Sequence, residues 1–340
     1  MTDSSLPTQT RAVTLAARPK GAPSESDFEM KTLDLWELNA EQVLIKNTTM
    51  SVDPYMRGRM DDRESYIPPF EIGEPLTGGA VGEVIASRSD DLPVGTRVLH
   101  FYGWRDYVVL DAEMVTPVDT EKAPEAAYLG ILGMTGLTAW VGLTVIGEFK
   151  EGDTVFVSAA AGSVGSAVGQ FAKLLGAKRV IGSAGGPEKC EYATSLGFDA
   201  VIDYKKGDIA GQLAEAAPEG VDVYFDNVGG ETLEAALGAM RRGGRVVMCG
   251  AISQMNTAEP APGPRNLALA IIKGLKLQGF TIGGYQKDHQ AEFYKHVLPW
   301  VAEGKVQWQT TVRHGLENAV GAFLELFSGG NTGKMVVELG

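Results

Sequence analysis

The sequence of 340 residues contains little cysteine and histidine, and its basic residues are outnumbered by acidic ones. Its two cysteines, Cys190 and Cys249, are too few for a disulfide scaffold or for a structural zinc site of three or four thiolates. We expect both to be small core residues, because free cysteine is often buried.

The patterns that bind catalytic metals are also missing from the sequence. No HExxH motif occurs, no cysteine precedes residue 190, and no cysteine and histidine stand at ligand spacing. We therefore expect no metal site and exclude an alcohol dehydrogenase that polarises its substrate with zinc. Any hydride transfer would have to stabilise the developing oxyanion with organic donors, such as hydroxyl groups of the protein or cofactor.

The charge balance excludes two classes of partner. The chain has 30 Lys and Arg against 43 Asp and Glu, a net charge of −13. Such a surface repels nucleic acid and anionic lipid, so we expect neither nucleic acid nor a membrane as a partner. A ligand that carries phosphate is expected only where basic side chains or backbone amides are concentrated locally.

One long uncharged stretch, residues 126–147, needs a separate explanation. Its 22 residues have the length of a membrane span but include five glycines and three threonines. We interpret it as a buried helical segment of a soluble domain. The first ten residues are polar and lack the order of a signal peptide, so the expected location is the cytoplasm.

The hydrophobic pattern changes near residue 125. Short apolar runs separated by turn residues predict a compact β domain before this point, with strands at 43–45, 81–86, 98–101 and 107–110. After it, apolar strands alternate with helical stretches, which predicts a parallel sheet covered by helices.

The second part is expected to be a doubly wound, Rossmann-like α/β domain. The predicted strands are 154–158, 179–183, 200–202, 221–226, 245–249 and 277–282. The predicted helices are 163–175, 187–197, 209–216, 231–240 and 267–273. A final helix at 316–327 and a strand at 334–339 need not belong to this sheet.

The most informative segment is TVFVSAAAGSVG at residues 154–165, in which a strand runs through a small-residue turn into a helix. Compared with the GxGxxG fingerprint, Ala160 replaces the first glycine, while Gly162 and Gly165 match the second and third. Such a turn lets a pyrophosphate reach the free amides at the helix N-terminus. The segment therefore predicts a dinucleotide site.

A hydrolase is the rival interpretation of the same residues. AGSVG approximates the GxSxG nucleophile elbow, which would make Ser163 a nucleophile. Asp226 and one of three histidines, His289, His296 or His314, would have to complete a triad. None of these histidines lies in a glycine-rich loop, so the sequence favours the dinucleotide site.

The end of the second Rossmann strand indicates which dinucleotide is bound. NAD sites place a carboxylate here for the ribose hydroxyls, but residues 180–186 read VIGSAGG without an acid. Ser183, Gly185 and Lys189 supply a hydroxyl, a free amide and a cation instead. This combination favours the 2′-phosphate of NADP(H).

Six motifs in order carry a resemblance to a known family. They are SVDPYMRGRM (51–60), GMTGLTA (133–139), SAAAGSVGS (158–166), FDNVGG (225–230), CGAIS (249–253) and NTGKMVVE (331–338). The chain resembles the zinc-free medium-chain dehydrogenase/reductases, in particular the group of prostaglandin reductases, plant alkenal double-bond reductases and bacterial curcumin reductases.

The resemblance implies a fold and an activity. It implies a GroES-like substrate domain (1–125) completed by the C-terminal residues 306–340, a Rossmann NADP-binding domain (126–305), and a cleft between them. It also implies NADPH-dependent reduction of the carbon–carbon double bond of α,β-unsaturated aldehydes and ketones, with hydride added at the β carbon. Members usually form homodimers through their Rossmann domains.

The resemblance also implies site residues. The implied cofactor contacts are Gly162, Ser163, Val164, Gly165, Lys189, Tyr204, Asn227, Cys249, Gly250, Ala251, Ile252, Ser253, Phe280, Thr281, Ile282 and Asn331. Tyr55 and Tyr66 resemble positions that face the substrate, and are therefore the candidate catalytic residues.

The chain departs from the family pattern in one place. Relatives commonly have an SxYN segment whose tyrosine is thought to act on the substrate carbonyl, but this chain has Met255 there. Methionine cannot donate a hydrogen bond, so Tyr55, Tyr66, Tyr285 or a water would have to replace it. The following loop, 258–264, contains three prolines and one glycine and is expected to be a mobile lid.

Three other functions remain open at this point. A quinone reductase or a hydroxy-dehydrogenase would use the same scaffold, and quinones or secondary alcohols tested beside enones would separate them from an enone reductase. A hydrolase acting through Ser163 would turn over esters without a nucleotide. A dinucleotide-binding protein without turnover would bind NADPH tightly and leave all substrates unchanged.

Overall fold

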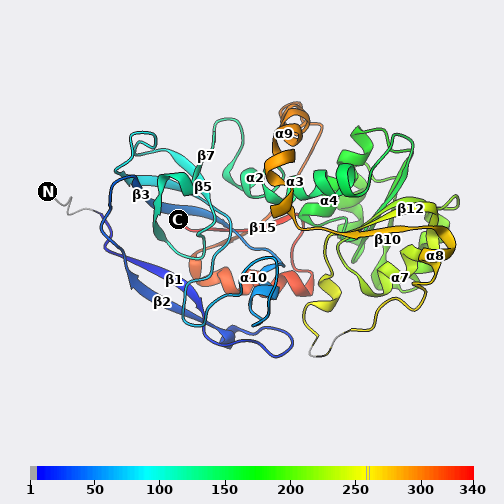
Figure 1. Cartoon of the computed structure of the whole chain (residues 1–340), viewed down its shortest axis with the longest axis horizontal. Helices are drawn as coiled ribbons and strands as arrows, with labels where there is room; N and C mark the ends of the chain where they lie inside the picture. Colours follow the sequence, from blue (N-terminus) through cyan, green and yellow to red (C-terminus); the bar gives the residue numbers. More distant parts are fainter. Residues whose placement is uncertain (1–5, 258, 260) are drawn as a thin grey trace. The chain divides into compact units, whose positions relative to one another are not determined.

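The computed structural model describes residues 6–257, 259 and 261–340, which form two compact units (Figure 1). The first unit comprises the chain up to Leu129 together with Thr310–Gly340, and the second is Gly130–Gln309. Residues 258 and 260, part of the loop expected to act as a lid, lie outside the described residues.

The first unit is built on a seven-stranded sheet, to which the C-terminal segment of the chain adds two strands. The order is β14-β15-β3-β4-β5-β7, and β6 also pairs with β3. Its strands are β3 (Gln42–Ser51), β4 (Ala80–Ser87), β5 (Arg97–His100), β6 (Tyr107–Asp111), β7 (Thr116–Pro117), β14 (Thr310–His314) and β15 (Lys334–Glu338). Because β15 runs antiparallel to β3, the NTGK motif lies beside the strand that leads into the DPY motif.

A separate hairpin and three helices complete this unit. The hairpin pairs β1 (Gln9–Leu15) with β2 (Phe28–Asp34), and the helices are α1 (Met56–Arg59), α2 (Glu125–Leu129) and α10 (Ala319–Ser328). The sequence pattern does not predict the hairpin. Polar and charged residues fill most positions of β2, and none of its residues is fully buried, so its hydrophobic signal is weak.

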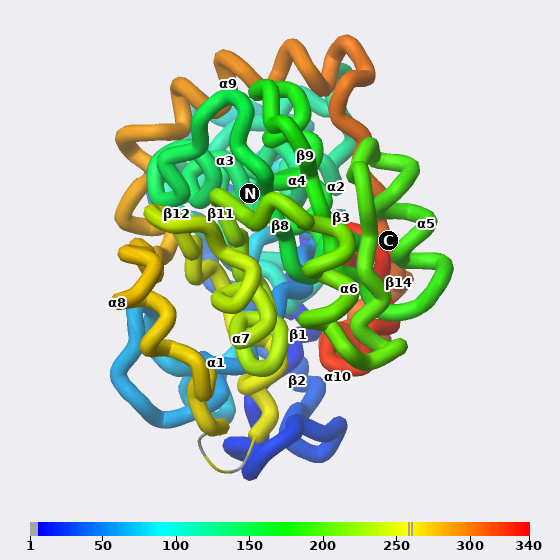
Figure 2. The backbone as a smooth tube through the Cα atoms, turned by 90° about the vertical axis from the view of Figure 1, so that its right-hand side faces the viewer, coloured from blue at the N-terminus to red at the C-terminus, as the bar shows by residue number. Residues whose placement is uncertain are grey.

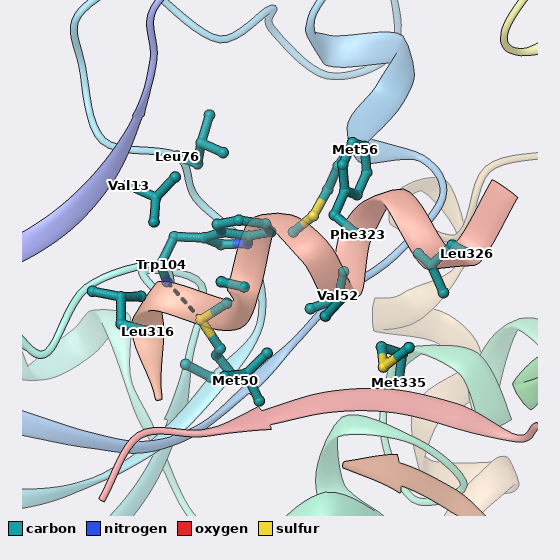
Figure 3. Close-up of a cluster of buried hydrophobic side chains, with 14 of the residues drawn as sticks. Val13, Met50, Val52, Met56, Leu76, Trp104, Leu316, Phe323, Leu326 and Met335 are labelled. Carbon is teal, nitrogen blue, oxygen red and sulfur yellow. Dashed lines mark hydrogen bonds between the residues drawn. The ribbon is translucent and has the colours of Figure 1, made fainter. Parts of the chain in front are cut away.

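A buried cluster fixes α1 in this unit (Figure 3). Trp104 lies at its centre, where its backbone N–H donates to Met50 Sδ at 3.3 Å and its ring meets Phe323 of α10 edge-on at 6.3 Å. Met56 and Met60, at the two ends of the α1 turn, reach into the same cluster. Burial of these side chains therefore holds the short helix that follows Tyr55.

The second unit contains the predicted parallel sheet. Its six strands are β8 (Thr154–Val157), β9 (Arg179–Ala184), β10 (Ala200–Asp203), β11 (Val221–Asp226), β12 (Met240–Met248) and β13 (Lys276–Gly279). They pair in parallel in the order β10-β9-β8-β11-β12-β13. This is the doubly wound order 3-2-1-4-5-6, so the predicted Rossmann-like fold is confirmed.

Helices α4 (Ser163–Leu174), α5 (Pro187–Ser195), α6 (Ile209–Ala216), α7 (Gly230–Ala239) and α8 (Leu269–Lys273) connect the strands. Figure 2 shows α4 beside β8 and β9. The sequence pattern does not predict α9 (Gln286–Ala302), because only Phe293 and Val297 of its residues are buried and because it contains Pro299, a residue type that usually ends a helix. The strand expected at 277–282 ends at Gly279, and Ile282–Gly284 form a 3₁₀ turn.

The uncharged stretch 126–147 is helical and largely buried, but in three pieces. After α2, the chain forms α3 (Met134–Val141), which continues into one π-helical turn at Gly142–Ile146. Glycines at 130 and 133 separate the first two pieces, since glycine in a helix interior is unfavourable. Among the described residues, no helix has the length and apolar character to cross a membrane.

Candidate functional site

The glycine turn between β8 and α4 has the geometry of a phosphate cradle. A Cβ added to Gly165 would lie 2.2 Å from the Ala159 carbonyl oxygen, so any side chain here would push α4 away from the turn. Ala159 itself adopts a left-handed φ of 52°, a conformation that costs free energy and is common at binding sites. No side chain caps α4, so its first backbone amides remain available for an anion.

Ser163 begins α4, and its hydroxyl contacts Thr135 rather than a histidine. The two Oγ atoms are 2.7 Å apart, which joins the GMTGLTA motif to the glycine turn. Asp226 is buried, and its Oδ1 accepts hydrogen bonds from Tyr224 Oη at 2.7 Å and from the Gly229 amide at 2.8 Å.

The candidate histidines have other partners. His289 lies near the ring of Tyr285, His296 stacks on Trp140 and bonds Glu292, and His314, in the first unit, lies 3.1 Å from Glu338. The contacts of the described residues therefore do not assemble a hydrolase triad around Ser163.

The residues predicted for the 2′-phosphate lie together at the carboxyl ends of β9 and β10. Tyr204 packs over Gly185, where a Cβ would lie 2.6 Å from Tyr204 Oη. Ser183 is buried at 2% exposure. Lys189 is half-buried on α5, and its pKa is lowered by burial and by the nearby charge of Lys205.

Sequence reasoning missed Lys205 and Lys206, which extend this cluster. The Asp203 carboxylate accepts the Lys205 amide at 3.1 Å and the Gly186 amide at 2.9 Å, and so holds the turn after β10 against the β9 loop. In the part of the chain that the structure describes, no carboxylate lies within ion-pair distance of Lys189, Lys205 or Lys206. The sequence signal that could have identified them is the pair of adjacent lysines shortly after the predicted strand 200–202.

A cavity of about 340 Å³ adjoins this lysine cluster. Tyr204 and Ile209 form its apolar part, and Asp208, Glu231, Glu234 and Asn266 give it polar atoms. Asn266 Oδ1 is buried and has no hydrogen-bond partner among the described residues. The cavity therefore offers an aromatic surface beside polar and charged side chains.

The FDNVGG and CGAIS loops, predicted separately, are joined by hydrogen bonds. The Ile252 amide donates to the Asn227 carbonyl at 3.3 Å, and Ser253 Oγ donates to the Val228 carbonyl at 2.6 Å. The amides of Cys249 and Gly250 both donate to the Asp226 carbonyl. Ala251 lies between these anchored residues and contacts the position of Gly229.

Two residues of these loops have distinct roles: the thiol of Cys249 is unreactive, and Asn227 anchors its loop. Burial, together with the charge of Asp226, raises the pKa of the Cys249 thiol to about 12, so it stays protonated. Asn227 Nδ2 donates to the Ser158 carbonyl at 2.8 Å, which ties the loop to the end of β8.

The remaining predicted cofactor residues are divided between the units. Phe280, Thr281 and Ile282 follow β13. The Phe280 ring packs against Gly142, where an added Cβ would lie 2.9 Å from the ring. Asn331 belongs to the first unit, where its Nδ2 donates to the Gly333 carbonyl at 3.0 Å. The structure thus groups the predicted residues of the second unit at the carboxyl edge of its sheet.

The two candidate catalytic tyrosines both lie in the first unit. The Tyr55 hydroxyl is buried without a hydrogen-bond partner among the described residues, and its ring stacks on Phe101 at 6.5 Å. Burial and the negative charge of Asp53 raise the pKa of Tyr55 well above its usual value, so the phenol stays protonated. Tyr66 is 65% exposed, and its charge also influences the pKa of Tyr55.

Comparison with protein families accounts for most of the chain. Residues 11–118 match a family model described as the N-terminal domain of oxidoreductase, and residues 163–303 match one described as zinc-binding dehydrogenase. Although the second description names zinc, the described residues contain no group of three or more His, Cys, Asp or Glu side chains placed to hold a metal ion.

Individual relatives match over nearly the whole chain. NADPH-dependent curcumin reductase of Escherichia coli is 41% identical over 96% of this chain and 95% of its own length. The NADP(+)-dependent 2-alkenal reductase of Nicotiana tabacum is 40% identical over 93% of this chain and 94% of its own.

A solved structure also matches nearly the whole chain. The crystal structure of CurA from Vibrio vulnificus in complex with NADPH has a TM-score of 0.92 and 42% identity, and the match covers 97% of this chain and 99% of that one. The predicted family is confirmed: the chain belongs to the medium-chain dehydrogenase/reductases, in the group that includes curcumin, prostaglandin and 2-alkenal reductases.

Proposed function

We propose that this protein uses NADPH to reduce the carbon–carbon double bond of α,β-unsaturated aldehydes and ketones. The observation that carries the proposal is the unpaired lysine cluster beside the uncapped N-terminus of α4, in a chain 41% identical to a curcumin reductase that depends on NADPH. In this proposal the first unit is the substrate domain and the second is the NADP-binding domain.

The residues of the second unit fit the phosphates of this cofactor. The amides of Ser163, Val164 and Gly165 would receive the pyrophosphate, because no side chain caps them. Lys189 and Lys205 would meet the 2′-phosphate next to Tyr204. The cofactor, when bound, supplies the hydride that is added to the β carbon of the substrate.

The cavity next to Tyr204 is proposed to take the adenine. Its volume of about 340 Å³ and its aromatic wall suit a purine, and the unpaired Asn266 Oδ1 would accept from the exocyclic amino group. The joined loops at Asn227 and 249–253, together with 280–282 and Asn331, are proposed to contact the rest of the cofactor.

Tyr55 is proposed to stabilise the substrate oxygen during reduction. Hydride addition at the β carbon places negative charge on the carbonyl oxygen, and a hydroxyl donor at that oxygen lowers the barrier. The buried Tyr55 hydroxyl lacks a partner among the described residues and is therefore free to donate. Met255 cannot supply such a donor, so Tyr55 and Tyr66 remain the proposed catalytic residues.

Absorbance measurements test the proposed function directly. NADPH and, separately, NADH are mixed with a small enal, an aryl enone, a quinone or a saturated ketone, with and without a chelator. We expect oxidation of NADPH by the enal or enone that the chelator leaves unchanged. Oxidation by the quinone alone would favour a quinone reductase, and tight NADPH binding with no turnover would contradict the proposal.

Replacing Tyr55 with phenylalanine is expected to lower kcat for an enone about 10- to 100-fold, because one donor to the developing oxyanion is lost. The KM for NADPH should stay unchanged, since its proposed phosphate contacts lie in the other unit. Tyr107→Phe, another change in the first unit, is the matched control. An unchanged kcat in Tyr55→Phe would assign Tyr55 to packing.

The protein is further proposed to form a homodimer through the β13 edge of its Rossmann sheet. The strand β13 ends the sheet, and an open edge invites pairing with another strand. Next to it in the chain, α8 exposes Ile271 and Ile272 at 86% and 61%, and Leu267 is 50% exposed. Apolar surface of this kind marks interaction sites.

Replacing both Ile271 and Ile272 with aspartate is expected to convert the dimer to a monomer in light scattering, because charged side chains would be buried against the partner. Leu298→Asp, on α9 at 45% exposure, should leave the mass unchanged. A wild-type monomer would contradict the proposed dimer. The cytoplasm remains the expected location, which fractionation of cells that produce the protein would test.

A further inference from the structure

Arg59 is a buried arginine on the short helix that follows Tyr55. Its exposed fraction is 9%. The guanidinium donates to the Pro68 carbonyl at 2.9 Å and to Thr77 Oγ1 at 2.7 Å, and it lies over the Phe70 ring at 3.9 Å. These contacts fix the direction of the side chain but supply no negative charge.

Arg57, on the same helix, is a buried arginine whose charge is paired. Arg57, at 3% exposure, forms a salt bridge with Asp61 at 2.7 Å. Within the described residues, Arg59 has no carboxylate at ion-pair distance. A charge this deeply buried is normally paired, so an uncompensated one indicates that negative charge is met at another time.

Tyr55 is the N-cap residue of the short helix α1, whose last residue is Arg59. The two residues stand four positions apart across one helical turn, which places their side chains on the same side. Burial lowers the pKa of Arg59, and ionisation of Tyr55 or of Tyr66 would raise it, so both phenols are close enough to interact with the guanidinium.

Asp53 is the other charged residue on the same segment that acts on Tyr55. Asp53 forms a buried ion pair with Lys334 and also bonds Ser51, so its charge is matched within the first unit. Burial and Asp53 raise the pKa of Tyr55, while Arg59 lowers it. Arg59 is therefore the one of these charges that favours electron density on the phenol oxygen without a counter-ion beside it.

We propose that Arg59 is a positioning residue for the reduction: its fixed charge strengthens the Tyr55 hydroxyl as a hydrogen-bond donor to the substrate carbonyl oxygen. The inference rests on the proposed function, in which that oxygen gains negative charge. No proton or electron passes through Arg59. It acts by stabilising the charge that spreads onto the Tyr55 oxygen as the hydrogen bond shortens.

The coupling is measured first without turnover. A fluorinated tyrosine at position 55 ionises at lower pH than tyrosine, and its fluorine NMR shift follows the ionisation in the whole protein. Arg59→Gln should raise the pH midpoint of this ionisation by about one unit or more, because it removes a nearby positive charge that favours the ionised phenol. Arg59→Lys, which keeps the charge, should move it less. A midpoint that Arg59→Gln leaves unchanged would overturn the inference.

Turnover then separates positioning from a purely structural role. With an enone, Arg59→Gln should lower kcat about tenfold when Tyr55 is present. In the Tyr55→Phe background the same change should alter kcat less than about twofold, because residues that act together are not additive. Equal losses in both backgrounds would show a structural role and overturn the inference.

Two controls keep the outcomes distinct. Arg57→Gln, the matched buried arginine, should affect kcat equally in both Tyr55 backgrounds, because its charge is paired with Asp61. If Arg59→Gln does not fold, the same comparison is made with Arg59→Lys, which moves the charge, and an equal loss of kcat in both Tyr55 backgrounds overturns the inference. If the wild-type protein reduces no enone, the proposed function is overturned, whereas an ionisation midpoint that Arg59→Gln raises still supports the charge coupling.

Discussion

Replacing Lys189 with alanine is expected to raise the KM for NADPH about 10- to 100-fold and to leave the KM for NADH nearly unchanged. A hydrogen bond to a charged group contributes about 1.5 to 3 kcal/mol, and each 1.4 kcal/mol is a factor of about ten in affinity. Only NADPH carries the 2′-phosphate that this ammonium would meet. Steady-state kinetics with both nucleotides measures the effect.

The matched control for this change is Lys173→Ala, which removes a lysine of α4 that is already paired with Asp199 at 2.9 Å. It should alter neither KM. Lys205→Ala should give a smaller loss with NADPH than Lys189→Ala, because Lys189 is the more buried of the proposed contacts. Equal effects of Lys189→Ala on the two nucleotides would contradict a role in binding the 2′-phosphate.

The same site predicts a pH dependence. Burial and the charge of Lys205 hold the pKa of Lys189 below its usual value in the protein without cofactor. The charged form binds phosphate, so affinity for NADPH should be complete below this pKa and should fall as the pH rises through it. Affinity for NADH should not follow this decline, which calorimetric titration of both nucleotides can test.

Replacing Lys334 with methionine is expected to lower the free energy of unfolding of the first unit by about 3 to 5 kcal/mol, because it leaves the buried Asp53 carboxylate without its counter-ion. Both residues are 3% exposed. Lys334 Nζ also donates to the Val52 carbonyl at 3.3 Å, and that contact is lost as well. Thermal and denaturant unfolding measure the change.

Two further variants serve as controls for the stability change in Lys334→Met. Lys305→Met removes an exposed pair with Glu303 and should change stability by less than about 1 kcal/mol. Adding Asp53→Asn to Lys334→Met should recover part of the lost stability, because an uncharged amide then replaces the buried carboxylate. If Lys334→Met unfolds no more easily than Lys305→Met, the ion pair does not stabilise this unit.

Local patterns in the sequence were sufficient for the parallel sheet of the second unit. Strand and helix alternation predicted all six strands of the Rossmann sheet, because most of them contain an apolar run bounded by turn residues. The prediction started β12 at residue 245, but the strand begins at Met240, because its first half, MRRGG, is polar. The glycine turn was identified for the same reason, since the need for glycine at 165 is set by atoms only a few residues away. Helix α9 was missed because its exposed faces leave little hydrophobic signal.

The sequence by itself therefore determined the family, the parallel sheet, the glycine turn before α4 and the lack of an acid at the end of β9. Tertiary structure alone decided which charges are paired. Asp53 and Lys334 are 281 positions apart and meet because β15 pairs with β3. Whether a charge such as that of Arg59, Lys189 or Lys205 is compensated depends on side chains brought together from distant segments, and short-range hydrophobic patterns carry no information about those contacts.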